Sequence, residues 1–399
     1  MKKIMILGAS RLQVPAIQEA KRRGLFVIAV DYDKNAEGFS VADKCIDIST
    51  IDCEGVYKAA LENKPDYIIT STSDMPVRTV AYVREKLNMP LDISYTDSFC
   101  ATNKAFMRQR FRECGIPIPR FNVIEEEDEF KTLYPTYGDR FIIKPADNAA
   151  SRGVRLVDID KGTDPLECYK FSFGRSRTGT VLIEEYMLGP EVSVESFTLN
   201  GITDVIAITD KIVTQPPFFV ELGHTEQSQL SENIKRQIKD VVKRTLSAVG
   251  VINGPSHTEL KITTEGPKVV ETAARLGGDF ITSKLVPLST GIDMTVCSIS
   301  LAVGEHVDLT RKYDRGSAIR FIPTTFGIIA GIDNIKNAKK MFGVTEIELY
   351  KKIGDRIGGT ESSNDRIGHV IATGKDANQA AAICDAAMKT ISVEIVSEQ

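Results

Sequence analysis

The 399-residue sequence lacks any long run of lysine or arginine, and its 50 basic and 54 acidic residues leave a net charge of −4. A protein that binds nucleic acid is expected to concentrate positive charge along one stretch or face. The charge balance therefore argues against a nucleic-acid partner and favours small-molecule ones.

The cysteines are few, odd in number and never spaced as Cys-x-x-Cys. This spacing argues against a zinc site and against a secreted disulfide framework, and buried apolar thiols are the expectation. The seven are Cys45, Cys53, Cys100, Cys114, Cys168, Cys297 and Cys384.

Long hydrophobic runs are also lacking at the amino terminus, where the apolar stretch Ile4–Leu7 stops after four residues. A signal-peptide core or a membrane span needs a much longer stretch. We therefore expect a cytoplasmic protein with no membrane partner.

Several common catalytic motifs are absent: Gly-x-x-x-x-Gly-Lys-Ser/Thr, Gly-x-Ser-x-Gly and His-Glu-x-x-His. The turn Gly8–Ser10, which follows the first predicted strand, imitates a dinucleotide-binding loop together with Asp31. The complete Gly-x-Gly-x-x-Gly run is missing, so a nicotinamide site is a weak alternative. Any phosphate-binding site must therefore be formed by other residues.

Residues 1–97 alternate short apolar runs with amphipathic stretches, which predicts a parallel sheet with helices on both faces. The predicted elements are strands at Ile4–Leu7, Phe26–Val30 and Tyr67–Thr70, with helices at Val14–Arg23, Cys53–Asn63 and Val77–Leu87.

A second unit, 98–305, opens with a predicted helix at Lys104–Cys114 and a boundary at Gly115–Pro119, where two prolines forbid helix continuation. The rest of this unit reads as an antiparallel α+β region. We expect residues 306–399 to form a separate cap or lid. The predicted elements are strands at Ala318–Ile322 and Ile367–Thr373 and a closing helix at Ala377–Thr390.

Lys144 ends the apolar strand Phe141–Pro145 and is followed by a loop of small residues that runs to Gly153. Such a loop can approach a polyphosphate and donate backbone N–H groups, while a lysine on a strand supplies a point charge. Taken alone, a lysine in a strand is more often a solvated charge at a sheet edge.

Glu184 and Glu185 close another apolar strand, the chain turns at Tyr186–Pro190, and Glu191 follows. Such a hinge can offer backbone groups to an adenine edge and a carboxylate to ribose hydroxyls. Surface acids beside a hairpin are the alternative interpretation.

Glu259 and Glu271 give the strongest signal, because they lie on two predicted strands joined by the turn Gly266–Pro267. Two carboxylates on adjacent strands can face one side and bind Mg²⁺ together with phosphate oxygens and water. Arg275 lies four residues further on, close enough to neutralise a transferring phosphoryl group or an oxyanion. His257 shares a strand face with Glu259, where we expect a neutral, structural histidine that holds the carboxylate.

Taken in order, these segments resemble the ATP-grasp superfamily, and most closely its L-amino acid ligase branch, with carbamoyl-phosphate synthetase and biotin carboxylase more distant. The segments are Lys104, Phe141–Pro145, Val181–Met187, Gly189–Val194, His257–Leu260 and Glu271–Arg275. The resemblance implies a Rossmann-like pre-ATP-grasp domain (1–97), an ATP-grasp domain (98–305) with a small flap subdomain (about 120–187), and a C-terminal α+β cap (306–399).

The resemblance also implies a role for each matching residue. Phosphate contacts are implied for Lys104 and Lys144, beneath a flap at Ser151, Arg152 and Gly153. Adenine contacts are implied for Glu184, Glu185 and Met187, a ribose contact for Glu191, and Mg²⁺ (or Mn²⁺) coordination for Glu259 and Glu271. Arg275 is implied to stabilise the reacting group together with Lys144, and Gly277, Gly278 and Asp279 to approach the substrate carboxylate.

Glu221 and His224 follow an apolar segment that begins at Gln215, and they are candidates to bind the amine or to act as base. A packed surface loop is the equal alternative for this segment.

The sequence departs from the family pattern in two places. Ala273 stands where the motif Glu-x-Asn-x-Arg usually has asparagine, so the number of metal ions, one or two, stays open. The flap is also poorer in glycine than usual, since Gly153 is its only glycine.

The implied reaction is amide formation between a carboxylate and an amine through an acyl phosphate, with release of ADP and phosphate. Activation of bicarbonate and a non-catalytic ATP-binding regulator are the alternatives. A homodimer is possible, and the sequence does not identify the two substrates.

Overall fold

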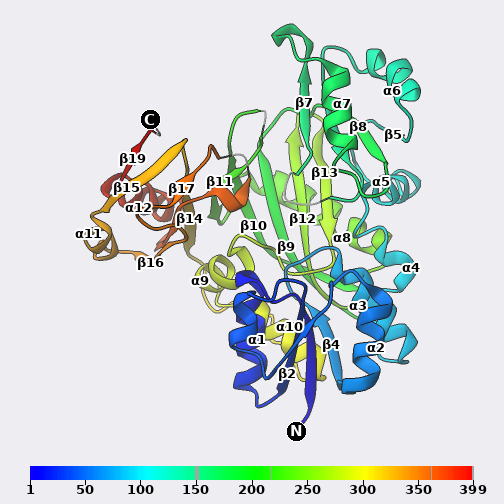
Figure 1. The fold of residues 1–399 in the computed structure, drawn as a ribbon, viewed down its shortest axis with the longest axis vertical. Helices are drawn as coiled ribbons and strands as arrows, with labels where there is room; N and C mark the ends of the chain where they lie inside the picture. The colour runs from blue at the N-terminus through cyan, green and yellow to red at the C-terminus, as the bar shows by residue number, and fades with distance from the viewer. Residues whose placement is uncertain (149–151, 217, 361, 398–399) are drawn as a thin grey trace.

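The computed structural model describes residues 1–148, 152–216, 218–360 and 362–397. Figure 1 shows three lobes, an N-terminal one in blue, a central one in green, and a C-terminal one in orange and red. The N-terminal lobe has a parallel sheet and the other two have antiparallel sheets. The predicted combination of α/β and α+β architecture is therefore confirmed.

The N-terminal lobe is a parallel sheet with strand order β3-β2-β1-β4. Alternate strand residues pack into two cores, one on each face, as a parallel sheet covered on both sides requires. Helices α1 and α10 cover one face, and α2 and α3 cover the other. The elements are β1 (Lys3–Leu7), η1 (Arg11–Gln13), α1 (Val14–Arg22), β2 (Phe26–Asp31), η2 (Glu37–Ser40), β3 (Lys44–Asp47), α2 (Cys53–Asn63), β4 (Tyr67–Thr70), α3 (Pro76–Lys86) and α4 (Tyr95–Ser98). The next helix, α5 (Lys104–Glu113), packs into the core of the central lobe.

The small subdomain at the top of Figure 1 is an antiparallel sheet with strand order β5-β8-β6-β7. Its core is aromatic, and the rings of Phe130 and Tyr169 stack with their centroids 4.7 Å apart. The elements are β5 (Phe121–Ile124), α6 (Glu127–Leu133), η3 (Tyr134–Tyr137), β6 (Arg140–Pro145), β7 (Arg155–Asp158), η4 (Ile159–Lys161), α7 (Pro165–Phe173) and β8 (Val181–Glu185).

The central sheet has the strand order β13-β12-β9-β10-β11-β14-β18-β16 and runs from the central lobe into the C-terminal lobe. Helix α8 packs its apolar stripe against one face of this sheet. The elements up to the C-terminal lobe are β9 (Glu191–Leu199), β10 (Ile202–Val213), β11 (Glu221–Glu226), α8 (Glu232–Val249), β12 (Gly254–Thr263), β13 (Gly266–Ala273), η5 (Ile281–Leu285), α9 (Val286–Thr290) and α10 (Met294–Val303).

The C-terminal lobe, predicted as a separate cap, shares this sheet, because β11 pairs with β14 through Gly223–Arg320 and the three following partners. A second, smaller sheet has the order β17-β15-β19. The elements are β14 (Gly316–Ile322), β15 (Gly327–Asp333), α11 (Ile335–Lys339), β16 (Val344–Leu349), β17 (Arg356–Ile357), η6 (Ser363–Asp365), β18 (Gly368–Gly374), α12 (Ala377–Thr390) and β19 (Ser392–Val396). The predicted limits at 97 and 305 stay predictions.

Not every cysteine is buried: Cys45 and Cys114 are exposed, in contrast to the expectation from composition. Among the described residues, no single helix is long and apolar enough to cross a membrane. One pair, Ile281–Thr290 and Met294–Val303, reaches that length and composition only when joined across a bend of 108°. Both members contribute side chains to internal cores of the protein.

A substitution at Gly189 tests how closely the turn after β8 packs against β12. Its φ is +137°, and a Cβ atom there would lie 1.9 Å from the carbonyl oxygen of Ile262. We expect Gly189→Ala to lower the free energy of unfolding by about 3 kcal/mol, because backbone must move. The control is Gly162→Ala, which also has a positive φ but no described heavy atom within 4 Å, and which should cost about 1 kcal/mol. Denaturant melts followed by circular dichroism measure both, and equal losses would contradict the close approach.

Candidate active site

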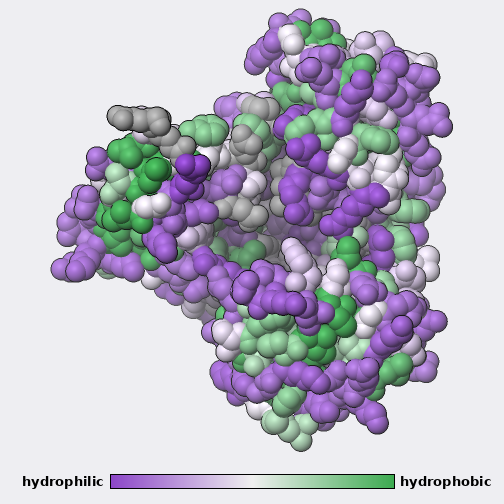
Figure 2. Space-filling view, viewed as in Figure 1, coloured by the Kyte–Doolittle hydropathy of each residue, from purple (hydrophilic) through white to green (hydrophobic). Residues whose placement is uncertain are grey.

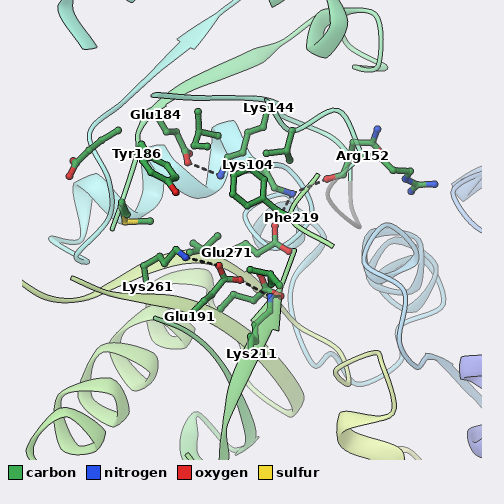
Figure 3. A pocket seen from close by; sticks show the side chains of 18 of the residues that line it. Lys104, Lys144, Arg152, Glu184, Tyr186, Glu191, Lys211, Phe219, Lys261 and Glu271 are labelled. Carbon is green, nitrogen blue, oxygen red and sulfur yellow. Dashed lines mark hydrogen bonds and ion pairs between the residues drawn. The ribbon is translucent and has the colours of Figure 1, made fainter. Parts of the chain in front are cut away.

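A pocket lies between the small subdomain and the central sheet, and its lining combines buried lysines and glutamates with apolar side chains. Figure 3 shows Lys144, Glu184 and Tyr186 on one side of this pocket, and Glu191, Lys211 and Lys261 on the other. The predicted site residues that line it are Lys104, Lys144, Arg152, Glu184, Glu185, Met187, Glu191, Glu221, Glu259 and Glu271. Residues separated by up to 167 positions in the chain, from Lys104 to Glu271, are thus brought to one place.

The subdomain side of the pocket holds one carboxylate between two cations. Glu184 lies 2.7 Å from Lys144 Nζ and 2.7 Å from Arg108 Nε, and all three side chains are buried. Burial alone would raise the pKa of Glu184, but Arg108 and Lys144 lower it to about 2. Burial lowers the pKa of Lys144 to about 8, although Glu184 opposes this. The two cations and one anion leave an excess positive charge, which suits an anionic ligand.

The sheet side of the pocket gathers several carboxylates. Glu259 pairs directly with Glu271 across β12 and β13, as predicted for two carboxylates that share one side. Lys211 Nζ lies 2.8 Å from Glu259, 2.7 Å from Glu191 and 3.8 Å from Glu221. Burial would lower the pKa of Lys211, but these carboxylates raise it well above its usual value.

Three carboxylates surround Lys211 on the sheet side. Lys261 and His257 add further cations beside Glu191 and Glu259. Carboxylate oxygens are the ligands that Mg²⁺ prefers, so this donor set fits the predicted metal. Lys104 Nζ, 2.8 Å from Glu271, reaches the same cluster from α5.

The hinge after β8 lines the pocket through Glu185, Tyr186 and Met187, as expected for an adenine-binding segment. Glu184 itself points to Lys144 and Arg108, so its carboxylate is already engaged. Glu191 lies 3.3 Å from Lys261 as well as beside Lys211.

His257 lies beneath Glu259, as its position on the same strand face predicts, with its Nε2 atom 3.3 Å from the Glu259 carboxylate. Its Nδ1 atom lies 2.6 Å from buried Glu195. Burial would lower the pKa of His257, but the Glu195 carboxylate raises it to about 9. The histidine is therefore a cation at neutral pH, in contrast to the neutral ring expected from the sequence.

A second cavity adjoins the first and reaches the N-terminal lobe, and it contains the predicted substrate residues Glu221, His224, Gly278 and Asp279 together with Arg275. Figure 2 shows the corresponding hollow between the three lobes. Gly277 packs against Glu195 instead, because a Cβ atom there would lie 2.7 Å from its carboxylate.

Two ion pairs join the lobes across the second cavity. The guanidinium of Arg275 lies 2.7 Å from Asp74 of the N-terminal lobe, and Arg366 of the C-terminal lobe donates two hydrogen bonds to Asp279 at 2.7 and 2.9 Å. Burial would raise the pKa of Asp279, but Arg366 and His224 lower it below its usual value.

The predicted flap is described only in part. Ser151 lies outside the described residues, and Arg152 lines both cavities. Gly153 adopts φ +90°, and a Cβ atom there would lie 2.6 Å from the Pro145 ring, so glycine suits the close approach of the loop to β6.

Sequence reasoning missed Lys211, Arg108 and Arg366. Arg108 and Lys211 sit in a helix and a strand whose patterns favour solvent-exposed cations, and Arg366 comes from a loop of the last lobe. Only the partner carboxylates, which are distant in the chain, distinguish them from surface charges.

The sequence and the fold are both similar to those of ATP-grasp proteins. The ATP-grasp domain family matches residues 138–283, and the family named L-amino acid ligase C-terminal domain 2 matches residues 320–396. The chain is 30% identical over 328 residues to the uncharacterized protein y4rH of Sinorhizobium fredii, covering 81% of this chain and 67% of that protein. It is 22% identical to the formate-dependent phosphoribosylglycinamide formyltransferase of Mannheimia succiniciproducens, over 62% of this chain and 63% of that protein, which is less than two thirds.

Among solved structures, the fold is similar to the L-amino acid ligase from Bacillus licheniformis, with a TM-score of 0.83, 21% identity, and coverage of 100% of this chain and 99% of that one. It is also similar to the phosphoribosylglycinamide synthetase from Anaerococcus prevotii, with a TM-score of 0.78, 20% identity, and coverage of 99% and 100%.

The fold and the site define an ATP-grasp protein, and the predicted membership of this family is confirmed. The chain belongs to the ATP-grasp carboxylate–amine ligases, and its last lobe is the C-terminal domain found in L-amino acid ligases.

Glu184→Gln tests the buried charge cluster. We expect it to lower the free energy of unfolding at pH 7 by roughly 3 kcal/mol, because Arg108 stays buried without its anion. The folded pKa of Glu184, about 2, lies below its ordinary 4.5. Its stabilisation is therefore complete above pH 4.5 and is lost as the pH falls towards 2.

The matched control is Glu185→Gln, because Glu185 is an exposed neighbour that pairs with Lys268 at 3.3 Å and should change stability by less than about 1 kcal/mol. Denaturant melts between pH 3 and 7 compare the two variants with the parent. A Glu184→Gln deficit that is small, or that does not shrink on acidification, would contradict the cluster as described.

Proposed function

We propose that the protein joins a carboxylic acid to an amine in an amide bond, by way of an acyl phosphate and with release of ADP and phosphate. The observation that carries this proposal is the pair of buried charge clusters that face each other across the pocket, with two cations around Glu184 and three carboxylates around Lys211. One side suits a polyphosphate and the other suits the divalent cation that accompanies it.

Each predicted residue then has a task. Lys104 and Lys144 bind phosphate oxygens, with Arg152 in the flap, while the hinge Glu185–Met187 holds adenine and Glu191 the ribose. Glu259 and Glu271 hold Mg²⁺, which neutralises charge on the phosphates when it is bound.

In the first step, a carboxylate oxygen attacks the γ-phosphorus, the bond from that phosphorus to the bridging oxygen breaks, and ADP leaves. In the second step, the amine nitrogen attacks the carbonyl carbon, the bond from that carbon to the phosphate oxygen breaks, and phosphate leaves. Arg275, which lines the second cavity next to Glu271, is positioned to balance the negative charge that develops on the acyl oxygen.

The amine must lose a proton in the second step. Glu221 is the better of the two predicted bases, because it lines both cavities, whereas the His224 ring is buried and lies 3.4 Å from Asp279. Asp279, held by Arg366, is suited to bind a substrate cation. Acyl phosphates hydrolyse readily, so the reaction requires that bound substrates displace water from this cavity, which residues of three lobes line.

Bicarbonate activation is the second candidate, since the fold is also similar to a biotin carboxylase domain from Hydrogenobacter thermophilus, with a TM-score of 0.76. The second cavity extends beyond Arg275 to loops of the N-terminal lobe, which is more room than bicarbonate requires. This extent favours a larger acid.

The test of the proposal is ADP release with Mg-ATP across a panel of carboxylic acids, bicarbonate included, each with and without a panel of amines. Release that needs both partners and yields an amide by mass spectrometry is the expected result. ADP release with bicarbonate alone would favour the second candidate, and ATP binding without turnover would favour a regulator.

Glu271→Gln tests the assigned metal site. We expect it to reduce Mg²⁺-dependent ADP release by about a hundredfold or more, and to weaken Mg²⁺ binding to the nucleotide complex in calorimetry, because one carboxylate ligand is lost. Glu265→Gln, an exposed glutamate on the turn of the same hairpin, is the control and should leave both unchanged. Normal turnover and Mg²⁺ binding in Glu271→Gln would refute the assignment.

A further inference from the structure

The second cavity has two chemically different sides. The central sheet and the C-terminal lobe contribute mostly charged side chains. The N-terminal lobe contributes one large apolar side chain after each strand of its parallel sheet, among the smaller polar residues Ser49, Thr50, Thr72 and Ser73 and the carboxylate Asp74. The four apolar side chains are Leu12 after β1, Tyr32 after β2, Ile51 after β3 and Met75 after β4, and we call them the apolar wall. In open α/β sheets, ligands bind in the crevice outside the carboxyl ends of the strands, which is where the apolar wall lies.

The apolar wall is open to the cavity. Tyr32 is 74% exposed and Ile51 is 42% exposed, while Leu12 and Met75 are half-buried. Large apolar side chains that face a hollow, and not the open surface, gain most by contact with a ligand.

The loops that carry the apolar wall are held in place by buried hydrogen bonds. The Gln13 side chain is buried and donates to Thr72 Oγ1 at 2.6 Å and to Ser73 Oγ at 3.0 Å, which ties the loop after β1 to the loop after β4. The Asp31 carboxylate accepts from the Ala9 backbone at 2.8 Å, which ties the first loop to the end of β2. A surface fixed before binding costs little ordering when a ligand arrives.

The apolar wall also adjoins the reactive end of the cavity. Met75 directly follows Asp74, whose carboxylate lies 2.7 Å from Arg275. On the other side, Leu12 Cδ1 lies 3.8 Å from the place where a Cβ atom on Gly278 would be. A molecule whose carboxylate lies near Arg275 and Glu271 can therefore reach the apolar wall with its side chain.

We propose that the apolar wall binds the side chain of the acid that is activated, so that this substrate is a carboxylic acid with a large aliphatic or aromatic side chain. The inference rests on the proposed function and adds the substrate class to it. Tyr32 and Ile51 are specificity-determining residues in this account, because they offer the largest exposed area.

The experiment measures acid specificity without knowledge of the natural amine. Hydroxylamine, a small amine that traps acyl phosphates, is supplied with Mg-ATP and with pairs of acids that differ only in side-chain size, such as alanine with leucine and propionate with 4-methylpentanoate. We expect a kcat/KM for the larger acid that is at least about tenfold higher. Tyr32→Ser and Ile51→Ser should each lower that ratio by about tenfold, through loss of activity with the larger acid.

The control is Leu61→Ser, since Leu61 is 47% exposed on α2 and should leave the ratio unchanged. Equal kcat/KM values for small and large acids in the parent protein would overturn the proposed role of the apolar wall, and so would a ratio that neither substitution changes. Hydroxamate formation would still support the proposed ligase activity in both cases. A size preference confined to amines would overturn the assignment to the acid.

If no acid supports hydroxamate formation or ADP release, the proposed function fails, and direct binding still decides the apolar wall. Calorimetric titration with 4-methylpentanoate and propionate should then show a preference for the larger acid that Tyr32→Ser abolishes. Equal or absent binding of the two acids in the parent protein would overturn the inference.

Discussion

The pairing of buried lysines with buried glutamates is the constraint on which the rest of the site depends. A charge taken out of water needs a partner of opposite sign, and here every pair joins different elements: Lys104 of α5 with Glu271 of β13, Lys144 of β6 with Glu184 of β8, and Lys211 of β10 with Glu259 of β12. The Lys144–Glu184 pair lies within the small subdomain and the Lys211–Glu259 pair within the central sheet. Helix α5 joins the two parts, because its Arg108 pairs with Glu184 and its Lys104 pairs with Glu271. The ion pairs place two cations around Glu184 on one side of the pocket and three carboxylates around Lys211 on the other, groups that suit a polyphosphate and a divalent cation.

The same physical rule extends to the outer lobes. Asp74 joins the N-terminal lobe to Arg275, and Arg366 joins the C-terminal lobe to Asp279, so each end of the second cavity is closed by an ion pair that crosses lobes. The continuity of the central sheet from β11 into β14 makes the C-terminal lobe a fixed part of this cavity. The chemistry that we propose therefore needs all three lobes, because the residues that hold the substrate come from each of them.

Much of the fold could be predicted from the sequence, because local patterns determine it. The helices at Cys53–Asn63 and Ala377–Thr390 have the predicted limits. The predicted hairpin forms, but it turns at Thr264 and Glu265 and not at Gly266–Pro267, and a register shift between Glu259 and Leu260 brings Glu259 opposite Glu271. The charge partners could not be predicted, since Arg108 meets Glu184 across 76 positions and only the folded chain brings them together. The charge of His257 was missed for the same reason, because Glu195 comes from a different strand. Nor does a local pattern indicate that the strands of the last lobe extend the central sheet.

The most direct test of the account follows the oxygen atoms of the acid. The acid that supports amide formation is labelled with ¹⁸O in both carboxylate oxygens, and the released phosphate is analysed by mass spectrometry after one turnover. An acyl phosphate requires that one labelled oxygen appear in the phosphate, because the bond between the acyl carbon and that oxygen breaks when the amine attacks. Phosphate without label, with the displaced labelled oxygen found in water, would contradict the mechanism.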